Sequence, residues 1–421
     1  MGNFKLLLIV LAMGLLSLAI TPAEMDKQIS AFVSNNSIMG IALQITKGGA
    51  TVYRANQGYR DWDRKLLVDN STAFRVASLS KSMSSCGLLL LVEQNKLKLS
   101  DSINSLLGFD VVNPNFPTKS ITVEMLLSHQ SSLLDCVAYD YFLTDTDIAS
   151  SGTDVPKLRD LLVSGGKYYN TCLFANKTPG TYFTYTNMNY VIMGTIIEKL
   201  TNTRFDVWMK QNLLSKIGSL SYNPADLPVP NNLAALYTGL NGKWLAVKDN
   251  FNGTIPQRNL TGYIPGTNAG IYGPQAFVRA TTDELLKYIN MIRNKGLLNG
   301  TQVLKTTSVA DLVRPRYEYH GEAGGSYDDM HAYGLGIASF GYYPNDNVLK
   351  NKFTVGHTGS GYGLISAYYY SGDWAFSFVI NGILNGYTYN NDSIYQVERQ
   401  WVNALVDRFI TEASVGEETV I

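Results

Sequence analysis

Apolar positions in the first hundred residues form short strand-like runs, followed by one long helical run. Glu24–Asn35 has the pattern of a short amphipathic helix. Gly40–Thr46 and Thr51–Gly58 predict two strands joined by a tight Lys-Gly-Gly turn, which together make an antiparallel hairpin. From Ser78 to Asn95 the pattern becomes helical and strongly apolar, so a helix is expected after the hairpin.

The middle of the chain mixes helical segments with polar stretches. Helix starts are expected at Ser100-Asp101 and at Thr122-Val123-Glu124. Residues 130–180 are predicted to be irregular and residues 221–275 to form long surface loops, because both stretches are rich in polar residues, Gly and Pro. Three helices are predicted around these stretches: Asn189–Leu200, Phe205–Leu214 and Thr282–Asn294.

Strand patterns return near the C-terminus, before a final helix over Ser393–Ile410. The strands are separated by Gly-rich and Ser-Gly-Asp turns: Phe353–His357, Gly363–Tyr370 and Trp374–Asn381. Strands at both chain ends with helices between them predict an α+β fold. One antiparallel sheet would be built from both chain ends and flanked by helices, beside a mainly helical lobe.

The chain is expected to form one enzyme-sized unit. Its 421 residues are 45% hydrophobic and 16% charged, which is enough apolar material for a large core. The unit is predicted to span residues 24–410, with a helical lobe of about 65–330 inserted into the sheet lobe, followed by a tail at 411–421.

Charge and composition exclude several function classes. Lys and Arg together number 34, as do Asp and Glu, so no net charge directs the protein to nucleic acid or an anionic membrane. Four His and three Cys are spread over the chain without the spacing of a metal site, so neither a metal nor a cofactor is expected. The sequence leaves the oligomeric state open.

The N-terminus has the pattern of a targeting signal. Lys5 precedes the apolar run Leu6–Ile20, and the small residues Thr21-Pro22-Ala23 follow at a suitable cleavage point. This predicts a signal peptide over residues 1–23, with a retained anchor as the alternative. After cleavage the protein would be secreted, or would stay in the lumen of the secretory or endolysosomal pathway, without membrane attachment.

Sequons and cysteines fit an exported glycoprotein. Cys136 and Cys172 lie in a polar, loop-rich stretch and are expected to pair, whereas Cys86 lies in an apolar helical run that is typical of a buried, inert thiol. The alternative for the sequons is chance in an Asn-rich chain. The seven N-x-S/T sequons begin at Asn35, Asn70, Asn176, Asn252, Asn259, Asn299 and Asn391.

The strongest chemical signal is the pair Ser78 and Lys81 at the predicted helix start. Residues three apart on a helix share a face, so the lysine amine reaches the serine hydroxyl. A lysine that is desolvated against an apolar helix has a lowered pKa and removes the hydroxyl proton. Such a pair also occurs by chance on capped surface helices, so this motif alone carries little weight.

Two further motifs follow downstream. Tyr185 and Asn187 stand just before a predicted helix, where the tyrosine would shuttle a proton and the asparagine would hold a substrate carbonyl. His357, Gly359 and Ser360 end a predicted strand along which a substrate backbone fits. The backbone N–H of Ser360, paired with that of Ser78, would form an oxyanion hole.

In this order the three motifs resemble the serine β-lactamase and penicillin-binding-protein superfamily, in particular its class C-like branch of esterases, D-aminopeptidases and carboxypeptidases. S-x-x-K stands at Ser78–Lys81, Y-x-N at Tyr185–Asn187 and K/H-x-G at His357–Gly359. The flanking stretches FRVASLSKS, TVEMLLSHQSSLL, YTNMNYVIMGTIIEKLT, YGLGI and GHTGSGYG are similar to that branch, and the resemblance runs over about residues 25–410.

The resemblance implies a serine hydrolase that acts on a small-molecule or peptide substrate between the two lobes, and the predicted signal peptide implies that this hydrolase is secreted. Ser78 would be acylated, Lys81 and Tyr185 would share the general-base role in an order left open, and water would release the acyl group. The alternative is a non-catalytic descendant of the fold that binds a ligand in the cleft or self-assembles.

Two departures from the pattern narrow the expected substrate. His357 replaces the usual lysine, and a histidine is charged only near or below its ordinary pKa of about 6.5. This favours esters, amides or peptides over β-lactams and predicts different carboxylate recognition in an acidic compartment. Ser131-Ser132-Leu133 replaces the usual Ser-Gly-Leu, which indicates a local difference in a turn.

The remaining histidines are expected to be structural. His129 has no acid–nucleophile pair beside it, so it is assigned to the packing of the helical lobe. His320 and His331 lie in a Gly/Asp/Tyr-rich loop without the spacing of a zinc site.

Overall fold

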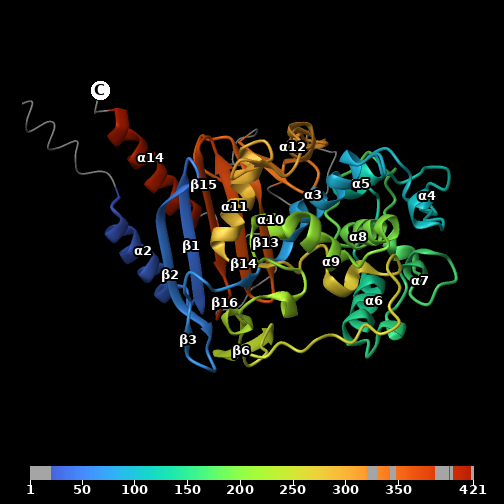
Figure 1. Ribbon diagram of the computed structural model, residues 1–421, viewed down its shortest axis with the longest axis horizontal. Coiled ribbons are helices and arrows are strands. Elements are labelled where there is room, and N and C mark those ends of the chain that lie inside the picture. Colours follow the sequence, from blue (N-terminus) through green and yellow to red (C-terminus); the bar gives the residue numbers. More distant parts are fainter. Residues whose placement is uncertain (1–19, 320–329, 342–347, 385–397, 399–401, 419–421) are drawn as a thin grey trace, which may run out of the picture.

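A computed structural model describes residues 20–319, 330–341, 348–384, 398 and 402–418 (Figure 1). Its main feature is an antiparallel sheet with the strand order β10-β11-β12-β13-β14-β15-β1-β2-β3. The long strands are β1 (Gly40–Lys47), β2 (Ala50–Asp61), β13 (Thr354–Gly361), β14 (Leu364–Ser371) and β15 (Trp374–Ile380). The short ones are β3 (Leu66–Leu67), β10 (Tyr317–Glu318), β11 (Ala332–Tyr333) and β12 (Ala338–Phe340).

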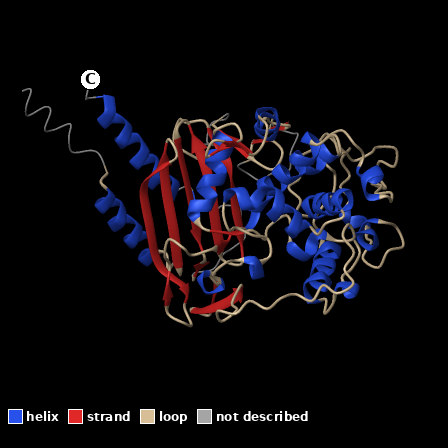
Figure 2. Ribbon diagram, viewed as in Figure 1, coloured by secondary structure: helices blue, strands red, loops and turns tan. Residues whose placement is uncertain are grey.

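The two chain ends meet in the middle of this sheet. β1 pairs with β15, with Ile41 opposite Ile380, and β1 also forms the predicted hairpin with β2. Figure 2 shows this sheet at one end of the molecule and most of the helices at the other. The α+β fold predicted from the sequence is therefore confirmed.

Helices cover both faces of the sheet because successive strand residues point to opposite sides. Ile41, Leu43 and Ile45 of β1 pack in one core cluster with α2 (Pro22–Asn35) and α14 (Ala404–Glu418). Ala42 belongs to the opposite cluster, together with α11 (Thr282–Arg293). In Figure 1, α2 and α14 lie on one side of the sheet and α11 on the other.

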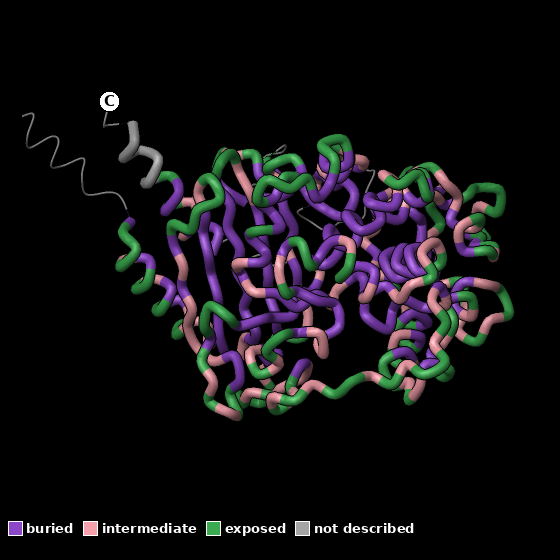
Figure 3. The backbone as a smooth tube through the Cα atoms, viewed as in Figure 1, coloured by how far each residue is buried: buried purple, intermediate pink, exposed green. Residues whose placement is uncertain are grey.

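The helical lobe is built around α3 (Ser80–Glu93), in which every residue from Ser80 to Leu91 is buried. An apolar helix buried all round belongs in a core, and Figure 3 shows the backbone of the molecule's centre as buried. The other helices of this half are α4 (Ile103–Leu107), α5 (Val123–Leu127), α6 (Val137–Ile148), α7 (Leu158–Leu162), α8 (Met188–Thr201), α9 (Phe205–Met209), α10 (Ser215–Ile217) and α12 (Thr306–Val313).

Several sequence predictions need correction. Residues 130–180 contain the helices α6 and α7 and are not simply irregular. The segment 221–275 is only partly a surface loop, because it forms β5 (Leu236–Leu240) and β6 (Lys243–Lys248) and buries the turn Ala269–Tyr272. The helix expected at Ser100-Asp101 begins at Ile103, since Ser102 accepts the capping hydrogen bond from Asn104.

The helix predicted over Ser393–Ile410 lies partly outside the described residues. Its described end, α14, continues to Glu418, into the segment expected to be a tail. The predicted signal segment up to residue 19 also lies outside the described residues. None of the helices that the structure describes is long and apolar enough to cross a membrane.

The three cysteines behave as the sequence predicts. Cys136 and Cys172 form a disulfide, which joins the start of α6 to the turn Thr171–Leu173. Cys86 is a free thiol buried in α3, and its burial raises the pKa of the thiol to about 12. A thiol with a raised pKa is a poor nucleophile, so Cys86 is a packing residue.

The disulfide should contribute substantially to stability. It links residues 36 positions apart, and closing a loop of that length in the unfolded chain stabilises the folded protein by about 4 kcal/mol. We expect the double variant Cys136→Ser/Cys172→Ser to lose a free energy of unfolding of that order in urea titrations. A reductant should destabilise the wild type but not the double variant, and a loss below about 1 kcal/mol would contradict this role of the bridge.

Candidate active site

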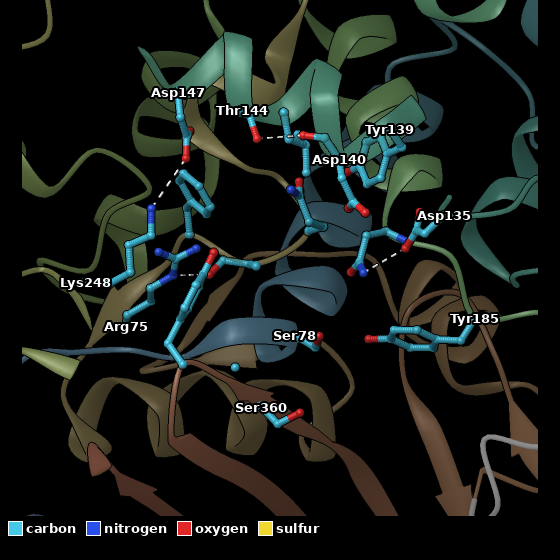
Figure 4. A pocket seen from close by; sticks show the side chains of 18 of the residues that line it. Arg75, Ser78, Asp135, Tyr139, Asp140, Thr144, Asp147, Tyr185, Lys248 and Ser360 are labelled. Atoms are coloured by element: carbon cyan, nitrogen blue, oxygen red, sulfur yellow. Dashed lines mark hydrogen bonds and ion pairs between the residues drawn. The ribbon is translucent and has the colours of Figure 1, made fainter. Parts of the chain in front are cut away.

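Ser78 lies in a single 3₁₀ turn, Ala77–Leu79, directly before α3. It lines a cavity of about 750 Å³ between the helical lobe and the β13 edge (Figure 4). Ala77 has a φ of 45°, a left-handed conformation that costs a non-glycine residue about 1–2 kcal/mol. Such strain is common beside functional groups that the surrounding structure holds in place.

The Lys81 side chain is fully buried and its amine has three partners. Nζ donates to Ser78 Oγ at 2.9 Å, to Asn187 Oδ1 at 2.8 Å and to the carbonyl of Gln275 at 3.1 Å. Three acceptors match the three hydrogens of an ammonium group. The Ser–Lys contact expected from the sequence is therefore present, and two additional groups fix its direction.

These contacts decide where the lone pair of a neutral Lys81 points. Asn187 Oδ1 and the Gln275 carbonyl have no hydrogen to give, so each must receive one N–H of the neutral amine. The remaining position on the nitrogen, its lone pair, faces Ser78 Oγ. Burial lowers the pKa of Lys81 to about 7, while the charge of Asp135 opposes this shift. The amine is therefore poised to accept the hydroxyl proton near neutral pH.

Asp135 orients Asn187 and was not identified from the sequence. Its carboxylate accepts hydrogen bonds from the backbone N–H groups of Asn187 and Met188 at the start of α8, at 2.7 and 3.0 Å. It also accepts from Asn187 Nδ2 at 2.9 Å, so the amide oxygen must face Lys81. Burial raises the pKa of Asp135, and the donated hydrogen bonds oppose that shift. One N–H of the Asn187 amide remains for a substrate.

Tyr185 lies across the cavity from Ser78, and Figure 4 shows its hydroxyl directed at Ser78. The Lys81 amine lies 4.7 Å from the centre of the Tyr185 ring. His129 stacks on the Tyr185 ring, with the two ring centres 4.3 Å apart. His129 itself is fully buried, and its Nδ1 accepts a hydrogen bond from the backbone N–H of Thr186 at 3.0 Å. Burial lowers the pKa of His129 well below its ordinary value, so it packs as a neutral ring beneath Tyr185.

Gly359 lets β13 approach Ser78 closely. A Cβ on Gly359 would lie 2.6 Å from the Val76 carbonyl oxygen and 3.1 Å from the backbone nitrogen of Ser78. Any other residue would push the strand away from the turn that carries Ser78. Ser360 follows and lines the same cavity, as expected for a residue whose backbone N–H would complete an oxyanion hole with that of Ser78.

His357 does not lie at the substrate-facing position expected from the sequence. It is fully buried and is not among the residues lining the cavity. Its Nδ1 donates to the Thr358 carbonyl at 2.5 Å, so its Nε2 accepts from the Tyr333 hydroxyl at 2.9 Å. Burial, together with the nearby Lys81, lowers the pKa of His357 to about 3. A neutral, buried His357 therefore gives no support to the expectation that carboxylate recognition changes in an acidic compartment.

The second departure from the family pattern is explained by the turn at Ser132. This residue has a φ of 64°, the left-handed conformation that favours glycine. Its hydroxyl accepts a hydrogen bond from Asn113 Nδ2 at 2.9 Å and donates to the Ala175 carbonyl at 3.1 Å. The side chain thus offsets the strain with local hydrogen bonds.

The remaining candidates lie away from this cavity or outside the described residues. His331 packs against Tyr319 with the two rings tilted and their centres 5.3 Å apart, and His320 is outside the described residues. Within the described part of the chain, no group of three or more His, Cys, Asp or Glu side chains could hold a metal ion.

Comparison with known proteins identifies the family. The family model Beta-lactamase matches residues 25–393, so the chain belongs to this family. Protein flp of Staphylococcus aureus (strain N315) is 24% identical over 194 residues, which are 46% of this chain and 36% of that protein. The chain thus spans little more than a third of that relative's length.

Solved structures share the fold at low sequence identity. The octameric penicillin-binding protein homologue from Pyrococcus abyssi has a TM-score of 0.66 at 18% identity, over 89% of this chain and 76% of that one. The D-amino acid amidase from Ochrobactrum anthropi SV3, complexed with L-phenylalanine, has a TM-score of 0.66 at 16% identity. That match covers 94% of this chain and 99% of the amidase.

Proposed function

We propose that this member of the Beta-lactamase family is a serine hydrolase that cleaves an ester or amide bond through an acyl-Ser78 intermediate. The observation that carries the proposal is the three-way coordination of Lys81 Nζ by Ser78 Oγ, Asn187 Oδ1 and the Gln275 carbonyl. Two of these partners hold the amine hydrogens and so aim its lone pair at the nucleophile. A lysine that served only packing would not need this arrangement.

The acylation step follows from these positions. Neutral Lys81 accepts the Ser78 proton while Oγ attacks the substrate carbonyl carbon. The backbone N–H groups of Ser78 and Ser360 stabilise the oxyanion that forms. When the tetrahedral intermediate collapses, the leaving group takes a proton from the Lys81 ammonium through the Tyr185 hydroxyl. Lys81 is then neutral again and accepts a proton from the water that attacks the acyl group. It returns this proton to Ser78 Oγ as the acyl C–Oγ bond breaks, which restores the starting state.

The neutral, buried His357 bears on the substrate class. Where a lysine would place a permanent cation at this point of β13, this chain places an uncharged ring away from the cavity. At this position there is therefore no positive charge that could bind the carboxylate of a β-lactam or of a cell-wall peptide. The proposed substrates are small esters, amides or peptides, which agrees with the amidase activity named for one of the structural neighbours.

We also propose that the protein matures in the secretory pathway. The six sequon asparagines among the described residues are all exposed, as glycan attachment requires: Asn35, Asn70, Asn176, Asn252, Asn259 and Asn299. The Cys136–Cys172 disulfide is typical of an oxidising compartment. The seventh sequon, Asn391, lies outside the described residues.

Covalent labelling tests the proposed mechanism. A fluorophosphonate probe reacts with activated serines, so we expect purified protein to carry one adduct, located at Ser78 by peptide mass spectrometry. Lys81→Met should slow the labelling, because the hydroxyl then keeps its proton. Absence of an adduct, together with no turnover on a panel of esters and amides, would instead indicate a non-catalytic descendant that binds its ligand in the cleft.

A further inference from the structure

Arg75 is a buried cation that pairs with no carboxylate among the residues that the structure describes. It ends the short strand β4 (Phe74–Arg75) and is only 5% exposed. Its Nε donates to the Ala276 carbonyl at 3.3 Å, and its guanidinium carbon lies 4.0 Å from the centre of the Phe277 ring. Among the residues that the structure describes, none forms an ion pair with Arg75 or a hydrogen bond with its two terminal nitrogens. An interior charge is normally paired, because an unpaired one is costly to bury.

Two carboxylates that line a cavity together with Arg75 are engaged by other cations. Asp249 binds Arg279 through two hydrogen bonds of 2.7 and 3.0 Å. Asp147, on α6, forms an ion pair with Lys248 at 3.6 Å, drawn as a dashed line in Figure 4. These four residues and Arg75 are the charged lining of a second cavity of about 510 Å³. Three cations face two carboxylates there, so one positive charge, that of Arg75, is left without a counter-charge.

Arg75 also lines the cavity that contains Ser78. The two cavities share Arg75, Asp147, Lys248 and Phe277, so they adjoin at this side chain. Arg75 precedes the nucleophile by three residues, and in Figure 4 both face the same space. A group bound at Arg75 can therefore belong to the molecule whose carbonyl carbon is attacked by Ser78. The rings of Phe277 and Tyr362, at 4.0 and 5.4 Å from the guanidinium, give this part of the cavity aromatic walls.

We propose that Arg75 binds a carboxylate of the substrate, so that this enzyme prefers esters or amides that carry a free carboxylate. The proposal rests on the serine hydrolase function proposed above and names the substrate class of the same site. The two terminal guanidinium nitrogens form a planar fork that matches the two oxygens of a carboxylate. A substrate carboxylate would supply the counter-charge that the described residues around Arg75 do not provide.

Two matched pairs of chromogenic esters test this preference. The first pair carries the charge on the acyl side: the para-nitrophenyl monoester of adipic acid against the same ester with its distal carboxyl methylated. The second carries it on the leaving group: the butyrate ester of para-hydroxybenzoate against that of para-hydroxybenzamide. In at least one pair we expect kcat/KM of the wild type to be about ten-fold or more higher for the charged member, as for one charge-assisted hydrogen-bonded contact.

Variants assign the preference to Arg75. In Arg75→Gln the ratio of kcat/KM within the preferred pair should fall to about one, and Arg75→Lys should retain only part of it, since an ammonium lacks the fork. Arg159→Gln removes an exposed cation outside both cavities and should keep the wild-type ratio. Both esters are measured on one preparation, so partial unfolding lowers both values and leaves the ratio unchanged.

The possible outcomes separate this inference from the proposed function. If the wild type hydrolyses both members of each pair equally well, carboxylate recognition is refuted while the hydrolase function stands. A preference that survives in Arg75→Gln refutes the assignment to Arg75. If no ester is hydrolysed and Ser78 takes up no probe, the proposed function itself fails.

Discussion

Replacing Ser78 by alanine is expected to lower kcat/KM for ester hydrolysis by about 10,000-fold or more. The reason is that the proposed catalytic groups act on the Ser78 hydroxyl or on the bond it forms. Lys81 aims its lone pair at Oγ, and Asn187 and the Gln275 carbonyl hold that amine in place. Without the hydroxyl, the remaining groups can bind a substrate but cannot form an acyl intermediate. Initial rates on a chromogenic ester, followed by active-site titration, measure the loss.

Ser360→Ala is the matched control for this variant. Ser360 lines the same cavity, and its proposed contribution is the backbone N–H, which alanine retains. We expect Ser360→Ala to lose less than about ten-fold, since only a side chain at the edge of the oxyanion hole is removed. If Ser78→Ala kept more than a hundredth of the wild-type rate, or if both variants lost activity equally, Ser78 would not be the nucleophile.

Much of the fold could be predicted because the hydrophobic pattern of its central elements is strong. Both strands of the β1–β2 hairpin, the three long C-terminal strands and the helices α3, α8 and α11 follow from runs of apolar residues at strand or helix spacing. The pairing of β1 with β15 follows in turn from strands at both chain ends. The Ser78–Lys81 contact could also be predicted, because residues three apart at a helix start are neighbours in any fold.

The helix α6 was missed because its residue types are poor helix formers. Val137–Ile148 contains three aspartates, two threonines and three aromatic residues, which have low intrinsic helix propensity. Tertiary packing overrides that propensity, since Ala138, Tyr139 and Phe142 are buried in the core of the helical lobe. The opposite face of α6 brings Asp147 to the cavity. Because α6 was not predicted, this part of the candidate site could not be predicted either.

A different reason explains why the partners of Lys81 and the burial of His357 could not be predicted. Gln275 contacts Lys81 through its backbone carbonyl, and any residue type supplies that group. Asp135 precedes Asn187 by 52 residues and has no motif that marks it. Burial of His357 depends on Tyr333, which arrives from β11 to bind its Nε2. These contacts join residues that are far apart in the sequence, so no local sequence pattern predicts them.

Replacing Lys81 by methionine is expected to lower kcat/KM by about 1,000-fold or more and to change its pH dependence. Methionine fills a similar volume but cannot accept the Ser78 proton. Lys81→Arg should be nearly as inactive, because a guanidinium keeps its charge at every accessible pH and cannot act as a base. An arginine variant with near wild-type activity would show that the cavity needs a positive charge there and not a base.

The pH profile of the wild type follows from the direction of the Lys81 pKa shift. Burial lowers the pKa of Lys81 to about 7, so the neutral, active amine becomes the major form as the pH rises through 7. Below that value kcat/KM should fall about ten-fold per pH unit, since one proton blocks the base. His357, with its pKa lowered to about 3, adds no second step between pH 5 and 8. In Lys81→Met the residual kcat/KM should no longer fall as the pH drops below 7. Lys96→Met, which changes an exposed lysine after α3, should keep the wild-type pH profile. A step that persisted in Lys81→Met would have to arise from another group and would remove Lys81 from the role of base.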